Sequence, residues 1–105
     1  MSIINRETAL SAGKRFASLV RSEIDSEALV MLFGSCAKDR IHERSDIDIA
    51  VVSKAFGDNV IENRVRVSLL GYQINLDIEA HPFSIEDWKY LTPFINEIKK
   101  TGVAL

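Results

Sequence analysis

The sequence predicts a single small α/β (α+β) domain, covering residues 1–105, in which helices cover a three-stranded mixed sheet. Two observations predict it. Short apolar runs rich in β-branched residues alternate with longer stretches whose apolar residues recur at helical spacing. The chain has 105 residues, of which 47% are hydrophobic and 27% charged, a composition typical of a globular domain with one core.

Composition and charge exclude several classes of protein. The 13 basic and 15 acidic residues give a net charge of −2 without a basic block, so we expect no strong nucleic-acid binding. A single cysteine excludes an internal disulfide framework and a Cys-rich zinc site. The longest apolar runs, such as Ala28–Phe33, fall well short of the roughly 20 residues of a membrane span. The N-terminus lacks the apolar core of a signal peptide, and we expect a cytoplasmic protein with no membrane association.

The first half of the chain predicts one helix and two strands. Residues Asn5–Ser22 carry apolar side chains at the spacing of one helical face, at Ala9, Leu10, Ala12, Phe16, Leu19 and Val20. Ala28–Phe33 is a continuous apolar run that ends at Gly34 and is typical of a buried strand. Ile47–Ser53 is a second β-rich run, which follows the charged loop Lys38–Ser45.

The second half predicts another helix, a third strand and two short helices. We expect a helix over Asp58–Leu70 that ends at Gly71 and turns inward Val60, Ile61, Val65, Ser68 and Leu69. The alternation over Ile74–Ala80 predicts a strand with one apolar and one polar face.

The C-terminal stretch contains clear helix start and stop signals. Ser84, followed by Asp87, is typical of a capping box that opens a short helix. Pro93 then begins a last helix, which ends at Gly102. The predicted order is α-β-β-α-β-α-α, with the sheet covered on one side.

A cluster of carboxylates on the predicted strands carries the functional signal. Asp46 and Asp48 alternate with apolar residues, so they project from one strand face, roughly 6–7 Å apart. Two carboxylates this close repel each other unless a cation lies between them. Mg²⁺ suits them, because it prefers oxygen ligands and often completes its coordination with phosphate oxygens. Asp77 and Glu79, on the polar face of the third strand, could reach the same ion.

The turn before this strand suits a phosphate group. Gly34 allows the backbone to approach a ligand closely, and Ser35 offers a hydroxyl and an amide. A phosphate-holding turn beside a carboxylate cluster indicates a metal-bound nucleoside triphosphate as the ligand.

These residues resemble a known family. Gly34-Ser35, a gap of ten residues and Asp46-Ile47-Asp48 resemble the signature of the DNA polymerase beta-type nucleotidyltransferase superfamily. The chain length resembles its smallest branch, the minimal nucleotidyltransferases of prokaryotes.

The resemblance extends from about residue 28 to the C-terminus. Phe33–Lys38 is similar to the family's turn, Ser45–Val51 to its metal strand, Leu76–Ile78 to its third-carboxylate strand, and Phe94–Val103 to the ending of the smallest branch. The chain departs from the pattern at Cys36, where a basic or aromatic residue is common, and at Asp39, where a glycine is common.

The resemblance implies transfer of a nucleoside monophosphate, AMP from ATP, to a hydroxyl acceptor, with pyrophosphate released and two Mg²⁺ ions as cofactors. It implies that the catalytic metal ligands are Asp46, Asp48 and Asp77. Glu79 is the alternative to Asp77, because both have apolar neighbours and lie on one predicted face. Gly34, Ser35 and Lys38 are then the nucleotide-binding residues.

Other side chains receive plainer interpretations. Cys36 is either a small packing residue or an exposed thiol in the phosphate turn. His81 precedes Pro82 at the end of the predicted strand, where we expect a capping or surface role rather than catalysis. Trp88 and Phe94 are expected in the core or at an interface.

The resemblance also implies a partner. It points to a HEPN-domain toxin, with this chain as the antitoxin that transfers AMP to a tyrosine of the toxin. The alternative is a non-catalytic partner-binding subunit that masks the toxin sterically. Modification of a small drug is less favoured, because the sequence has no room for a separate substrate domain, and the sequence leaves a homo-oligomer open.

Overall fold

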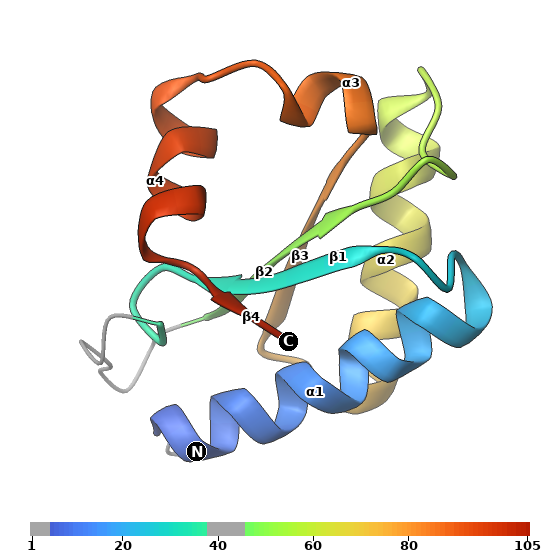
Figure 1. Ribbon diagram of the computed structural model, residues 1–105. Coiled ribbons are helices and arrows are strands. Elements are labelled where there is room, and N and C mark those ends of the chain that lie inside the picture. Colours follow the sequence, from blue (N-terminus) through green and yellow to red (C-terminus); the bar gives the residue numbers. More distant parts are fainter. Residues whose placement is uncertain (1–4, 38–45) are drawn as a thin grey trace.

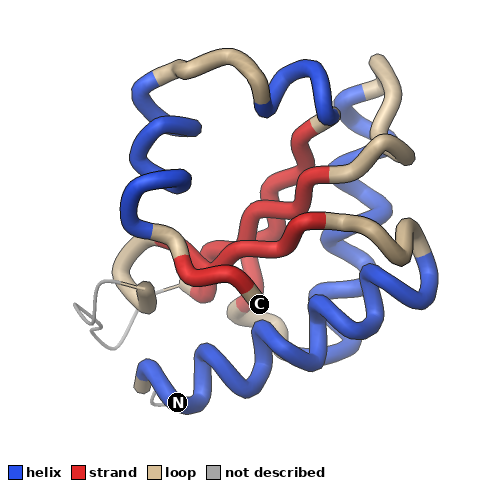
Figure 2. The backbone as a smooth tube through the Cα atoms, in the orientation of Figure 1, coloured by secondary structure: helices blue, strands red, loops and turns tan. Residues whose placement is uncertain are grey.

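A four-stranded mixed sheet forms the centre of the computed structural model, which describes residues 5–37 and 46–105 (Figures 1 and 2). Its strand order is β3-β2-β1-β4. The elements in chain order are α1 (Arg6–Glu23), β1 (Leu29–Phe33), β2 (Ile47–Val52), α2 (Val60–Ile74), β3 (Ile78–Phe83), α3 (Ile85–Trp88), α4 (Pro93–Thr101) and β4 (Val103–Ala104).

The mixed α+β class is confirmed, but the sheet has a fourth strand. Strand β1 pairs antiparallel with both β2 and β4, whereas β2 and β3 run parallel. Strand β4 has only two residues and follows directly on Gly102, which ends α4 as expected. A strand this short shows no alternation, so the sequence pattern did not indicate it.

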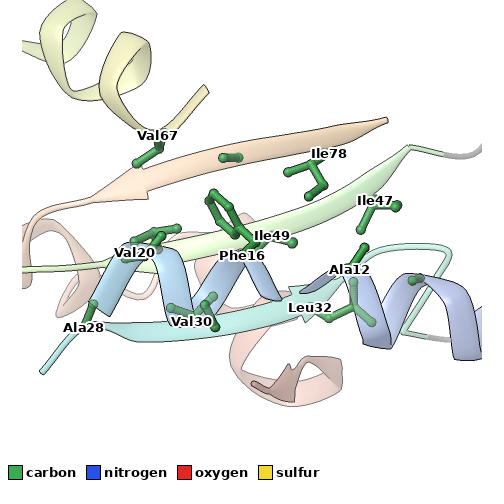
Figure 3. Packing of buried hydrophobic residues seen from close by; sticks show 14 of the residues in the cluster. Ala12, Phe16, Val20, Ala28, Val30, Leu32, Ile47, Ile49, Val67 and Ile78 are labelled. Carbon is green, nitrogen blue, oxygen red and sulfur yellow. The ribbon is translucent and has the colours of Figure 1, made fainter. Parts of the chain in front are cut away.

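The core lies between the sheet and the helices α1 and α2 (Figure 3). Phe16 of α1 packs there with Val30 and Ile49 from the sheet and Val67 from α2, all of them fully buried. A smaller cluster, Phe33, Ala50 and Ile98, lies on the opposite face of the sheet, with Trp88 of α3 packed against it. Helices therefore contact both faces of the sheet, rather than one face as expected.

Side-chain caps explain where the helices begin. Asn5 accepts a hydrogen bond from the amide of Thr8 at the start of α1, at 2.7 Å. Ser84 caps α3 and Thr92 caps α4, where Pro93 occupies the first turn. None of the helices in the two described segments is long and apolar enough to cross a bilayer.

Helix α2 differs from its prediction in length and in phase. It continues through Gly71 to Ile74, and Gly71 is buried against Ile78 of β3, where a Cβ would lie 3.0 Å from the Ile78 side chain. The glycine therefore serves close packing of helix on sheet instead of ending the helix. Its inward face includes Val67 and Gly71, whereas four of the residues expected inside are exposed, namely Val60, Ile61, Val65 and Leu69.

Strand β3 begins four residues later than predicted. The Asn75 side chain accepts a hydrogen bond from the amide of Asp77 at 2.8 Å, in the turn that separates α2 from β3. Leu76, which belongs to the apolar face of the predicted strand, is 80% exposed. The strand then continues through Pro82, which is tolerated because β3 lies at the edge of the sheet. As a result, Asp77 precedes the strand and Glu79 lies within it.

A buried hydroxyl ties the end of β2 to the turn before β1. Ser53 is fully buried, and its hydroxyl donates a 2.6 Å hydrogen bond to the carboxylate of Asp25. The Glu27 amide donates to the other Asp25 oxygen at 3.0 Å. The hydrogen bonds from Ser53 and Glu27 lower the pKa of Asp25 below its ordinary value of 3.8.

This lowered pKa predicts a specific loss of stability in acid. The folded state favours the Asp25 carboxylate, so its contribution is present above the unfolded pKa of 3.8 and disappears as the pH falls through the folded pKa. Urea unfolding of wild type and Asp25→Asn should therefore give a free-energy difference at pH 7 that shrinks towards pH 2.5. In a Ser53→Ala background the difference should be smaller at every pH, since the main donor is gone. An equal difference in both backgrounds would contradict this assignment.

Candidate metal and nucleotide site

The turn after β1 brings the backbone into contact with a carboxylate of β2. Phe33, the last residue of β1, pairs with Asp48. Gly34 follows with a positive φ of 73°, and a Cβ at that position would lie 2.6 Å from Oδ2 of Asp48. Only glycine fits, both because of the left-handed conformation and because of the carboxylate packed against it. Ser35, the next residue of the turn, is half-buried.

The parallel pairing of β2 with β3 places a second carboxylate beside the first. Asp48 is in register with Glu79, one step after the pair Ile47 and Ile78, whose side chains enter the core. Asp48 and Glu79 therefore project together from the opposite face of the sheet. Both are half-buried.

His81 completes this cluster. Its Nε2 lies 3.5 Å from Oδ1 of Asp48 and 3.9 Å from Oε1 of Glu79. One ligand atom from each of the three side chains falls within 4.8 Å of the others. The ring packs edge-on against Phe33 and Phe94, with centroid distances of 5.2 and 5.8 Å.

The expectation of a capping or surface role for His81 is therefore wrong. Its side chain is only 18% exposed, and Nε2 is buried without a hydrogen-bond partner among the described atoms. The alternation that puts Glu79 on the polar face of the predicted strand would place His81 on the same face, one residue beyond the predicted end at Ala80.

Asp46 and Asp77 lie beside the cluster rather than within it. Asp46 is exposed just before β2, and the amide of Ile47 donates to the carbonyl of Asp77 at 2.8 Å. Both aspartates line a pocket of about 260 Å³ at the edge of β3, together with Glu79. Its other side is formed by α2, from Arg64, Ser68 and Tyr72. Glu79 thus borders both the pocket and the cluster, and its Oε1 lies 3.7 Å from Nη2 of Arg64.

Lys38 and Cys36 lie at the end of the glycine turn in the sequence. Lys38, expected to contact phosphates, lies outside the described residues. Cys36 is buried, and its thiol donates to the carbonyl of Asp46 at 3.4 Å, so it is a packing residue and not an exposed thiol. Burial raises the pKa of this thiol, and the charges of Asp48 and then Asp46 raise it further.

The donor set fits a divalent cation. Carboxylates and an imidazole are common ligands of divalent metals. A buried polar atom normally makes a hydrogen bond, and within residues 5–37 and 46–105 Nε2 of His81 makes none. The glycine turn leaves one side of Asp48 against backbone instead of a side chain, which gives a ligand close access.

Comparison with known proteins agrees with this geometry. The family model described as "Polymerase beta, Nucleotidyltransferase" matches residues 19–105. The chain belongs to this nucleotidyltransferase family. The match includes the glycine turn, β2 and β3, and therefore all the candidate site residues. A comparison with curated proteins found no match.

Two solved structures share the nucleotidyltransferase fold. One is a toxin–antitoxin crystal structure with AMP-PNP, with a TM-score of 0.63 and 23% identity over 88% of this chain and 70% of that chain. The other is a mutant of the toxin–antitoxin MntA-HpeT, with a TM-score of 0.62 and the same identity and coverage. At this identity the likeness establishes the fold.

The close approach at Gly34 predicts that alanine is not tolerated there. Gly34→Ala should destabilise the protein by about 1–3 kcal/mol, because a side chain at positive φ is strained and the Asp48 carboxylate must move. Gly57→Ala is the matched control, since a Cβ there meets nothing within 4 Å. Urea unfolding measures both. Equal stability of the two variants would show that the turn tolerates a side chain.

The buried thiol predicts slow chemistry at Cys36. Its raised pKa and its burial both reduce attack by the thiolate, so the folded protein should react with Ellman's reagent far more slowly than the unfolded protein in guanidinium. The single cysteine makes the measurement unambiguous. Rapid labelling of the folded chain at pH 8 would mean that the turn opens.

Proposed function

We propose that the chain is a metal-dependent nucleotidyltransferase that transfers AMP from ATP to a hydroxyl group of a partner toxin, and so acts as an antitoxin. One observation carries this proposal. In a chain of the nucleotidyltransferase family, the glycine turn lies against Asp48, and Asp48 lies in register with Glu79. In the proposal the turn binds phosphate and the two carboxylates hold a metal ion.

The carboxylates are the proposed metal ligands. Asp46 and Asp48, with Glu79 or Asp77, would hold Mg²⁺, in one or two ions. When bound, such ions neutralise the triphosphate and stabilise the attacking and leaving oxygens of an in-line displacement. Glu79 is the better third ligand on geometry, because it is the residue paired with Asp48.

The turn and the pocket at the edge of β3 supply the remaining functions. Gly34 and Ser35 would contact the phosphates, with Lys38 as a further positive charge. The pocket lined by Asp46, Asp77 and Glu79 would receive the acceptor, and a carboxylate there would accept the proton that the hydroxyl loses.

The similar structures support the finer part of the proposal. One was solved with AMP-PNP, an analogue of ATP, and both are toxin–antitoxin assemblies. The mutant of MntA-HpeT replaces two aspartates, two positions apart, with glutamate. The same spacing separates Asp46 and Asp48. The HEPN-type toxin as partner, and one of its tyrosines as acceptor, come from the family resemblance of the sequence and complete the proposal.

A mass measurement tests the activity. The chain, a HEPN-type partner, ATP and Mg²⁺ should yield a partner heavier by one or more AMP groups, and a chelator should abolish the product. Asp48→Asn should reduce transfer about 100-fold or more while the chain stays folded, since a metal ligand is lost but a repulsive charge is relieved. Asp58→Asn, an exposed carboxylate in the loop before α2, is the matched control.

Other outcomes would change the proposal in defined ways. Label from ATP that enters RNA or a small molecule would refute the toxin acceptor and leave the transferase chemistry intact. Full transfer by Asp48→Asn would refute the metal site itself.

A non-catalytic role is the second candidate. It is favoured by the exposed apolar side chains of α2, Ile61, Val65 and Leu69, of which Ile61 is 78% exposed. Exposed apolar groups that recur along one helix are typical of a protein interface. If Asp48→Asn neutralises the toxin as well as wild type does, masking and not AMP transfer is the function.

A further inference from the structure

One imidazole nitrogen in the carboxylate cluster has no hydrogen-bond partner among the residues that the structure describes. Nε2 of His81 is buried, and no described atom lies within hydrogen-bonding geometry of it. Its nearest acceptor, Oδ1 of Asp48, is 3.5 Å away, beyond the usual range for a nitrogen–oxygen hydrogen bond. Buried polar atoms nearly always have a partner, so a nitrogen in this position is typical of a ligand-binding atom.

The position of this nitrogen is well defined by its neighbours. Phe33 and Phe94 pack against the ring from β1 and α4. Asp48 is restricted by the close approach of Gly34, and Glu79 by its pairing with Asp48. Strands β1, β2 and β3, the Gly34 turn and helix α4 thus meet around the three potential ligand atoms.

We propose that Nε2 of His81 coordinates the metal ion together with Asp48 and Glu79. The proposal rests on the metal site of the proposed function and adds a ligand of a different chemical class. Mg²⁺ favours oxygen ligands, whereas imidazole nitrogen binds first-row transition ions more strongly. The site is therefore a mixed nitrogen–oxygen centre that selects Mn²⁺ over Mg²⁺.

The observed separations agree with coordination of one ion. Ligands at about 2.1 Å from an octahedral ion lie about 3.0 Å apart when adjacent and about 4.2 Å apart when opposite. The distances from Nε2 to Asp48 and Glu79, 3.5 and 3.9 Å, fall between these limits. Small movements of side chains are enough to bring all three atoms onto one ion.

The rival interpretation is a positioning role, in which His81 orients Asp48 and never contacts the ion. Both interpretations predict weaker binding when His81 is replaced, so affinity alone does not separate them. Only direct coordination predicts magnetic coupling between the bound ion and a histidine nitrogen.

Pulsed electron paramagnetic resonance on the untagged full chain with Mn²⁺ alone makes this distinction. Wild type should show coupling of Mn²⁺ to ¹⁴N. His81→Phe, which retains a ring for Phe33 and Phe94 to pack against, should lose the coupling. His42→Phe removes the chain's other histidine and should retain it.

Calorimetry gives the matching affinities. His81→Phe should lower the affinity for Mn²⁺ about tenfold or more and change that for Mg²⁺ less. Mn²⁺ bound by wild type without nitrogen coupling would overturn the role of His81 and leave the proposed transferase intact. Coupling that persists in His81→Phe would also overturn it. Absence of any Mn²⁺ binding by wild type would overturn both this inference and the metal site of the proposed function.

Discussion

The parallel pairing of β2 with β3 is the constraint on which the site depends. Because Ile47 and Ile78 are partners that enter the core, Asp48 and Glu79 must be partners on the other face. A shift of one residue would turn the carboxylate of one strand into the apolar core. Burial of the two isoleucines on one face of the sheet therefore places the two carboxylates next to each other on the opposite face.

The face that carries the charges is also the less covered one. Helices α1 and α2 seal the large core, whereas α3 and α4 contribute a small cluster around Phe33, Ala50 and Ile98 (Figure 1). A binding site needs this asymmetry, since one layer supplies rigidity and the other leaves room for a ligand. Phe33 connects the small cluster to the candidate site, because it packs in that cluster and also against the ring of His81.

Local patterns predicted the first two strands and the capped starts of α3 and α4. They failed where a local pattern competed with a tertiary contact. The alternation over residues 74–80 suggested a strand, but Gly71 allows α2 to pack closely on Ile78 and the helix continues to Ile74. The choice between Asp77 and Glu79 depends on the register between β2 and β3, which no single-strand pattern contains. The pattern does not reveal the position of His81, because the predicted strand ends at Ala80 and the observed strand continues to Phe83.

Pro82 also has a consequence for association between chains. The carbonyl of Asp77 accepts a hydrogen bond from Ile47 at the start of β2, and the carbonyl of Phe83 accepts one from Ser53 just after β2. By alternation, the backbone of Pro82 points away from β2. Pro82 has no N–H group, so the row of hydrogen-bond donors along the outer edge of β3 is interrupted there. A strand from another chain would need these donors in order to pair with β3. The strand that presents Glu79 and His81 is thereby discouraged from acting as a template for intermolecular β-sheet growth and aggregation.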